Sequence, residues 1–338
     1  MIRNVNIIRV LWINSYVPRI SIGILFLLLL VGLGCGDSKK DQEIRILTIP
    51  RFDENKAYEN IEKQLSFGPR SHVSNGKDDC RDWLVSQFNS YAFTTTIQSF
   101  ESELYTGETV TGSNIIARWN PDIKERLLLC AHWDTRPEAD KDSSRMEEPI
   151  AGADDGASGV GVLLEIARQA SLADLPMGLD IVLFDLEDSG EDGESGDYLT
   201  WGLGSQYWSK NLPEENYEVK YGILLDMVGA QNATFPKEQF SRQSAPQVVQ
   251  KIWDLGIAMG RDRYFKDQPV DGVVDDHLFI IQNARIPMVD IINLSAEGRF
   301  GSYHHTHRDD IEIISKETLS AVGQVVLAVV FKESNKEF

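Results

Sequence analysis

The 338-residue chain is poor in several features, and each shortage excludes a class of protein. It has three cysteines and no Cys-x-x-Cys pair, so we expect neither a disulfide framework nor a closed thiolate zinc site. Its 33 Lys and Arg residues are outnumbered by 52 Asp and Glu residues, which argues against a nucleic-acid partner because such proteins need a basic face. No apolar run reaches the roughly 20 residues that a membrane-spanning helix requires. Internal repeats and low-complexity tracts are also missing from the sequence.

The N-terminus has the pattern of an export signal. Basic residues precede a short apolar run at 20–34, and Cys35 follows it directly. Cys35 stands where a bacterial lipoprotein has its modified cysteine. We therefore expect a signal peptide at 1–34, a tether at 35–42 and one catalytic domain at 43–338. The protein would be exported and held on the periplasmic or cell-surface side of a membrane by a lipid anchor alone. A plain secretory signal and an uncleaved anchor are the alternatives.

Two cysteines lie beyond this segment, Cys80 and Cys130. In an oxidising compartment they could form a single bridge, but two buried thiols are an equally good interpretation. Neither arrangement would supply the main stabilisation of a domain of this length, so we expect an ordinary hydrophobic core.

Hydrophobic periodicity predicts strands that alternate with helices. The expected helices, with apolar residues at helical spacing, are 52–67, 78–91, 157–172, 247–259 and 316–331. The expected strands are two alternating segments, 94–100 and 113–118, and four continuous apolar runs, 126–131, 179–184, 221–226 and 286–292. This order predicts an α/β fold, a single domain with a central mixed, mostly parallel twisted sheet and helices on both faces. The segments 138–151 and 189–200 are expected to be active-site loops.

Acidic or histidine side chains lie where three of the buried runs end. The first run leads into His132, the second leads into Glu187 and Asp188, and the third ends at Asp226. In open α/β sheets, ligands bind at the carboxyl ends of the strands. We therefore expect these side chains, which come from separate strands, to converge on one site.

Two further segments add candidate ligands. Asp155 lies in a Gly-rich stretch that opens a helix, but this stretch follows no strand and lacks the G-x-G-x-x-G spacing of a dinucleotide loop. His305 belongs to a group of three of the six histidines within four residues. Catalytic zinc sites use three nitrogen or oxygen ligands from the protein and keep one position open. The residues therefore predict a catalytic zinc site without choosing among five candidates: His132, Asp155, Asp188, Asp226 and His305.

The order of these motifs resembles the zinc-dependent aminopeptidase superfamily and, within it, the zinc-type glutaminyl cyclases of animals and bacteria. The resemblance covers the chain from about residue 52 to the C-terminus. The motifs that carry it are Phe67-Gly68-Pro69-Arg70, His132-x-Asp134, Asp154-Asp155-Gly156-Ala157-Ser158-Gly159-Val160, Phe184-Asp185-Leu186-Glu187-Asp188, Trp201-x-x-Gly204-Ser205, Leu225-Asp226-Met227-Val228-Gly229-Ala230, Asp275-Asp276-His277 and His305-Thr306-x-x-Asp309.

The resemblance implies a role for each matching position. Asp155, Asp188 and His305 would bind one Zn²⁺ per chain. Glu187 would be the general acid and base of the reaction. The enzyme would convert the N-terminal Gln of a peptide or protein to pyroglutamate and release ammonia. Asp275, together with Asp226, would support proton transfer and hold the substrate amine. A monomer is favoured, and peptides with N-terminal Gln are the expected partners.

Other positions mark where the resemblance is less complete. His132 and Asp134 match positions that hold or support a second metal in the aminopeptidases, a metal that the cyclases usually lack although similar residues persist. The possible second site in this chain is His132 with Asp226. Asp188 stands where animal cyclases have Glu, and His304 replaces a usual Trp of the substrate pocket. The candidates for the pocket walls are Trp133, Trp201 and Trp208.

Two rival functions remain open from the sequence. A dizinc aminopeptidase would use the same Glu187 to activate water, with all five candidate ligands engaged. A non-catalytic lipoprotein that binds peptides or sequesters metal would need no acid beside Asp188.

Overall fold

The computed structural model describes residues 46–193 and 196–338, so the predicted signal peptide, tether and Cys35 lie outside the described residues. The helices are α1 (Glu54–Leu65), α2 (Lys77–Ser90), α3 (Ala157–Ala173), α4 (Leu203–Lys210), α5 (Gln239–Ser244), α6 (Pro246–Ala258), α7 (Asp276–Ala284) and α8 (Lys316–Ser334). The strands are β1 (Thr94–Glu103), β2 (Thr109–Trp119), β3 (Arg126–His132), β4 (Gly178–Phe184), β5 (Gly222–Asp226), β6 (Phe235–Lys237), β7 (Phe265–Pro269) and β8 (Met288–Ile292). No helix of this described part is long and apolar enough to cross a membrane.

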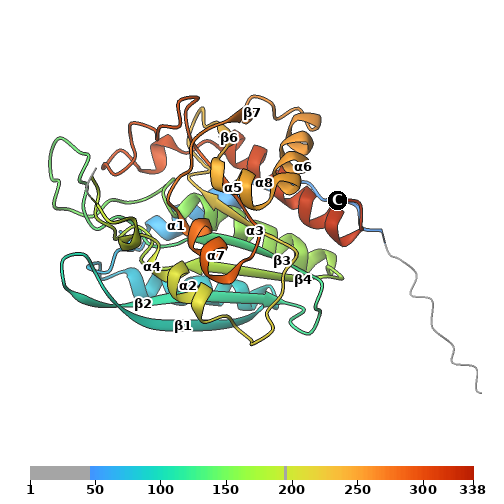
Figure 1. Cartoon of the computed structure of the whole chain (residues 1–338), viewed down its shortest axis with the longest axis horizontal. Coiled ribbons are helices and arrows are strands. Elements are labelled where there is room, and N and C mark those ends of the chain that lie inside the picture. Colours follow the sequence, from blue (N-terminus) through green and yellow to red (C-terminus); the bar gives the residue numbers. More distant parts are fainter. Residues whose placement is uncertain (1–45, 194–195) are drawn as a thin grey trace, which may run out of the picture. The chain divides into compact units, whose positions relative to one another are not determined.

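The central sheet has six strands in the order β1-β2-β4-β3-β5-β8. Figure 1 labels β1, β2, β3 and β4 of this sheet. Strands β4, β3, β5 and β8 are parallel neighbours, while β2 pairs antiparallel with both β4 and β1. All four parallel strands are buried along their whole length, which explains why they read as continuous apolar runs. The exposed residues of β1 suit its place at the sheet edge.

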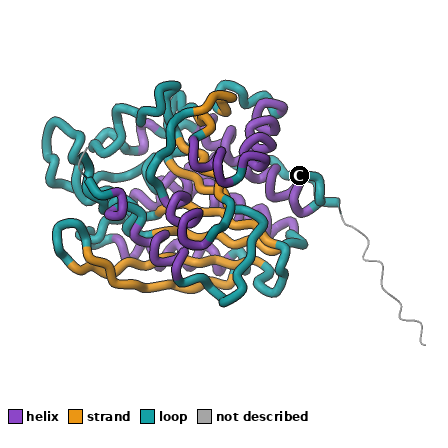
Figure 2. The backbone as a smooth tube through the Cα atoms, in the orientation of Figure 1, coloured by secondary structure: helices purple, strands orange, loops and turns teal. Residues whose placement is uncertain are grey.

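Helices cover both faces of the sheet, as Figures 1 and 2 show. Alternate residues of a strand point to opposite faces. In β3, Leu127 and Leu129 therefore pack in the larger core with α1, α2, α3, α6 and α8. Leu128 and Cys130 face the smaller core, where Trp208 of α4 and Ile280 of α7 lie. The expected mixed, mostly parallel sheet with helices on both faces is confirmed.

The structure corrects the sequence-based elements in several places. Strands β1 and β2 are longer than expected, while β5 and β8 begin one and two residues later. Helices α4, α5 and α7 and strands β6 and β7 were not predicted. None of these exceeds nine residues, so each samples its hydrophobic period too few times to stand out. Cys80 and Cys130 are both free and buried, which excludes the single bridge.

Candidate active site

The expected site residues meet at the carboxyl ends of the parallel strands. His132 is the last residue of β3, Asp226 is the last residue of β5, and Glu187 follows shortly after β4. Asp155 directly precedes Gly156, the residue just before α3, and His305 comes from the loop between β8 and α8. Parallel strands bring their carboxyl ends to the same edge, so residues far apart in sequence become neighbours there.

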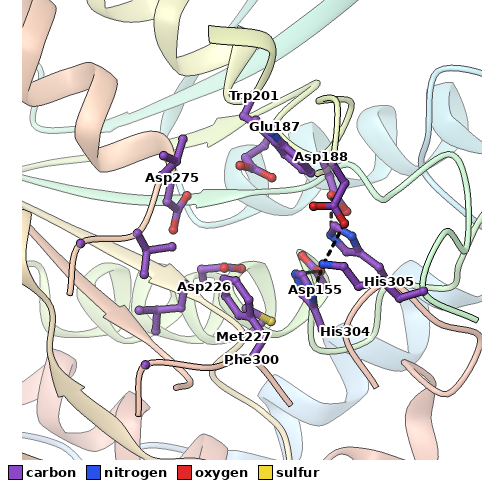
Figure 3. Close-up of a pocket in the computed structure, with 17 residues that line it drawn as sticks. Asp155, Glu187, Asp188, Trp201, Asp226, Met227, Asp275, Phe300, His304 and His305 are labelled. Atoms are coloured by element: carbon purple, nitrogen blue, oxygen red, sulfur yellow. Dashed lines mark hydrogen bonds and ion pairs between the residues drawn. The ribbon is translucent and has the colours of Figure 1, made fainter. Parts of the chain in front are cut away.

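These residues line a pocket of about 330 Å³ (Figure 3). Asp155, Asp188, His304 and His305 converge on one side of it, Asp275 lies across from them, and Asp226 lies between, close to Asp155. The polar lining is strongly acidic, with six carboxylates: Asp155, Glu187, Asp188, Asp192, Asp226 and Asp275. Like charges collected in one small pocket repel each other, so the site needs protons or a cation to hold it together.

The loops that carry three of these side chains adopt left-handed backbone conformations. The φ angles are +57° at Leu186, +46° at Met227 and +58° at His305. A residue other than glycine in this region costs about 1–3 kcal/mol and persists only when its surroundings hold it in place. Leu186 immediately precedes Glu187, and Met227 immediately follows Asp226. The strain therefore lies at the turns that aim the candidate catalytic groups.

His305 lies between two carboxylates. Its Nε2 is 3.1 Å from Asp188 Oδ1, and its Nδ1 is 3.2 Å from Asp140 Oδ1. A carboxylate beside Nδ1 keeps the ring proton on that nitrogen and leaves the Nε2 lone pair facing the pocket, as in many metal-binding histidines. Asp140 was not among the predicted site residues. It lies 165 positions before His305, so the sequence offers no local signal for the contact.

His132 belongs to a second cluster that shares Asp155. Its Nε2 is 3.1 Å from both Asp155 Oδ1 and Asp226 Oδ1. Candidate ligand atoms of these three residues lie within 4.8 Å of one another, and the same holds for Asp155, His304 and His305. Asp155 therefore stands between two places where a metal could bind. His304 was expected only at the pocket wall, and its nearness to Asp155 was not predicted.

Two buried charged residues fix the segment that carries Glu187 and Asp188. The carboxylate of Asp134 accepts the backbone N–H groups of Glu187 and Asp188 at 3.1 and 3.2 Å. The guanidinium of Arg136 donates to the Asp188 carbonyl at 3.1 Å and to Asp140 Oδ2 at 2.5 Å. These contacts restrain both the backbone of the acidic segment and the carboxylate that orients His305.

The loop that carries Asp155 is fixed in the same way. Asp309 Oδ1 and Oδ2 accept the backbone N–H groups of Asp154 and Asp155 at 2.7 and 3.1 Å. The guanidinium of Arg70 donates to the carbonyls of Ala151 and Gly152 at 2.6 and 2.7 Å. Arg70 and Asp309 both belong to motifs that the chain shares with the family. Their contacts show that these motifs hold the loop that carries Asp155.

Burial and neighbouring charges shift the ionisation of the pocket acids. Burial, reinforced by the charges of Asp275, Asp276 and Asp188, raises the pKa of Glu187 well above its usual value, although nearby His132 lowers it. Burial also raises the pKa of Asp226 to about 8 against the opposing hydrogen bond from His132. For Asp155, burial is outweighed by His132, which lowers its pKa below the usual range. The raised pKa makes Glu187 a candidate proton acceptor and donor.

Aromatic rings form one wall of the pocket. Phe300 stacks on His304 with ring centroids 4.2 Å apart, His304 stacks on His305 at 3.7 Å, and Trp201 lies 5.9 Å from His305. Of the three tryptophans expected at the wall, Trp201 alone lines this pocket.

The expectation was wrong for Trp133 and Trp208, which are fully buried elsewhere. Trp208 packs edge-on against Phe184 in the smaller core. Trp133 donates its indole N–H to the Ser113 carbonyl at 3.1 Å and belongs to the larger core. A sequence does not show which apolar face of an element turns toward a cavity. For this reason the nearness of Trp133 and Trp208 to the motifs does not predict that they line the pocket.

The Asp140–His305 contact leads to a prediction about metal binding. Asp140→Asn removes the carboxylate that orients His305 while it keeps the shape of the side chain. We expect the affinity for added Zn²⁺ to fall about 10–100-fold, the usual cost of losing such a supporting group. Competition between the metal-free protein and a chromogenic chelator measures this affinity. Asp142→Asn, which changes the carboxylate that contacts His307 on the same loop, is the control. Equal affinities in wild type and Asp140→Asn would contradict the assignment.

Comparisons with known proteins agree with this geometry. Residues 114–330 match Peptidase family M28. A glutaminyl cyclase from Porphyromonas gingivalis is 43% identical, covers 83% of this chain and 99% of its own, and superimposes with a TM-score of 0.81. A Zn-dependent exopeptidase from Parabacteroides distasonis is 41% identical, with coverage of 84% and 99% and the same TM-score of 0.81.

A curated relative agrees as well. A glutaminyl-peptide cyclotransferase from Gloydius blomhoffii is 25% identical over 316 residues, which cover 80% of this chain and 76% of that protein. The resemblance inferred from the motifs is therefore confirmed, and the chain belongs to Peptidase family M28.

Proposed function

We propose that this protein is a zinc-dependent glutaminyl-peptide cyclotransferase that converts N-terminal Gln of peptides or proteins to pyroglutamate. The observation that carries the proposal is the placement of Glu187. Its buried carboxyl shares a small acidic pocket with Asp155, Asp188 and His305 on one side and Asp275 on the other. The similarity to bacterial glutaminyl cyclases over more than four-fifths of the chain supports it.

The pocket residues fit a single zinc ion. Asp155, Asp188 and His305 would hold it, because carboxylate oxygen and imidazole nitrogen are ligands that zinc accepts. Within the described part of the chain, Asp188 Oδ2 is buried without a hydrogen-bond partner, and such an atom is costly unless something binds it. Zinc bound there would supply Lewis-acid polarisation of the substrate's side-chain amide.

The reaction needs one base that later acts as an acid. The α-amine of the N-terminal Gln forms a bond to its own side-chain amide carbon, and the bond from that carbon to the amide nitrogen breaks. Glu187 takes the proton from the attacking amine and passes it to the departing ammonia, so no water or redox partner is consumed. A raised pKa makes its carboxylate a stronger base toward the attacking amine.

Asp226 and Asp275 would hold the amine while it attacks. Both carboxyl groups line the pocket, Asp275 across from the proposed metal ligands and Asp226 beside Asp155. Asp275 Oδ1 accepts the Asp276 N–H at 2.5 Å at the start of α7, which leaves its buried Oδ2 free to accept a substrate N–H. Because amine and carbonyl belong to one residue, this positioning is the main catalytic need.

One observation favours a second candidate function, a dizinc aminopeptidase. His132 Nε2 lies 3.1 Å from Asp155 Oδ1 and from Asp226 Oδ1, an arrangement that could hold a second metal next to the first. The similarity to a Zn-dependent exopeptidase from Parabacteroides distasonis supports this alternative. In this case Asp226 would be a ligand, and Glu187 would activate water.

An assay on two substrate classes separates the candidates. We expect the protein to release ammonia from a Gln-Xaa peptide, to lose this activity with a chelator, and to leave amino-acid anilides intact. Glu187→Gln should still bind zinc but lose about 10²–10⁴-fold in turnover, the usual contribution of general acid–base catalysis. Enzyme-coupled ammonia detection and metal analysis of the same samples measure both properties.

Two results would overturn this assignment. Anilide hydrolysis without pyroglutamate formation would show a peptidase. Near-wild-type turnover by Glu187→Gln would remove Glu187 from the reaction. Glu191→Gln, which changes an exposed acid on the loop after Asp188, is the control and should keep full activity.

We also propose that the protein is exported and anchored by a lipid on Cys35. The basic residues, the apolar run at 20–34 and the cysteine directly after it support the proposal. Detergent-phase partitioning of cells that express the full chain would test it. Wild type should partition with detergent, whereas Cys35→Ala should not, and equal partitioning of the two proteins would refute the anchor.

A further inference from the structure

Lys77 and Asp185 form a buried ion pair outside the candidate active-site pocket. Lys77 Nζ lies 2.7 Å from Asp185 Oδ1, and the side chains are 10% and 0% exposed. Neither residue lines the acidic pocket. Both line a separate cavity of about 560 Å³ next to the start of α2. The mechanism above gives the pair no role, although Asp185 lies only two residues before Glu187.

The carboxylate of Asp185 connects three parts of the fold. Its Oδ2 accepts the backbone N–H of Ser113 in β2 at 2.7 Å, and its Oδ1 accepts the N–H of Leu186 at 2.8 Å. The ammonium of Lys77, the first residue of α2, shares Oδ1. The bond to Leu186 stabilises the residue whose φ of +57° turns the chain so that Glu187 and Asp188 face the pocket.

The cation of Lys77 keeps this connection intact. Burial raises the pKa of Asp185 to about 6, and the charge of Lys77 opposes that rise. Trp133 restrains the lysine, since Nζ lies 5.5 Å from the centroid of its ring. Without the cation, a buried carboxylate has to take up a proton or attract water, and it becomes a weaker acceptor for Leu186.

We propose that Lys77 and Asp185 are positioning residues for Glu187 and Asp188. Asp134 holds the N–H groups of Glu187 and Asp188 themselves, whereas the Lys77–Asp185 pair holds the turn just before them. The left-handed turn at Leu186 is thereby fixed from both sides. The expected effect of the pair on turnover rests on the proposed function, whereas its expected effect on metal binding does not.

The test replaces Lys77 by Met, which keeps the length of the side chain and removes the charge. We expect kcat for a Gln-Xaa peptide to fall about 10–100-fold with little change in KM. We also expect Zn²⁺ to pass to a chromogenic chelator about 10–100-fold faster, because the loss of a supporting group at a metal site usually has an effect of this size. Asp185→Asn should likewise lower kcat and speed the release of Zn²⁺. The double variant should lose no more than the worse single variant, because the two residues act as one unit.

Lys220→Met is the matched control. Lys220 also pairs with a buried carboxylate, that of Glu333, but it precedes β5 and therefore lies at the opposite end of that strand from Asp226. A merely structural loss would lower the midpoint of thermal unfolding in both lysine variants without changing kcat or metal release in either. If Lys77→Met does not fold, Lys77→Gln takes its place with the same expectations.

Two results would overturn the inference. One is a Lys77 variant whose kcat and metal-release rate match those of Lys220→Met. The other is a double variant whose losses equal the product of the two single losses, because that would show independent effects. A wild-type protein that forms no pyroglutamate would instead refute the proposed function, and the comparison of metal-release rates would still decide the role of the pair.

Discussion

The mutual repulsion of buried carboxylates is the constraint on which the rest of this structure depends. The parallel strands deliver Glu187, Asp188 and Asp226 to one edge of the sheet, and the neighbouring loops add Asp155 and Asp275. Such a set is stable only if protons or cations balance its charge. Burial together with this repulsion raises the pKa of Glu187 and of Asp226. The need for compensation explains the close approach of His132 and His305 to the carboxylates, and it would favour a divalent metal.

Charged residues around the pocket hold these carboxylates in a defined geometry. Asp134 and Arg136 hold the backbone of the acidic segment, and Asp309 with Arg70 holds the loop of Asp155. The contacts to Glu187 and Asp188 hold the segment that follows the left-handed residue Leu186, whose backbone conformation is costly by itself. The pocket is thus shaped before any substrate arrives, as expected when a reaction depends on positioning more than on binding energy.

Much of this could be predicted from the sequence, for physical reasons that also explain the failures. Strands buried on both faces read as continuous apolar runs, and the polar residues after them mark the catalytic edge. The contact between Asp140 and His305 and the pairing of Lys77 with Asp185 join distant loops and leave no local pattern. Short elements such as α7, and the orientation of Trp133 and Trp208, depend on packing that periodicity does not record. The choice among five candidate ligands came from the family resemblance and not from spacing.

The central claim is that one zinc ion binds Asp155, Asp188 and His305 while His132 and Asp226 stay free of metal. Anomalous diffraction from crystals of the zinc-loaded protein, recorded on both sides of the zinc absorption edge, tests this most directly. The account predicts one anomalous peak, in contact with Asp155, Asp188 and His305. Two peaks, with the second between His132 and Asp226, would contradict it and support the dizinc aminopeptidase.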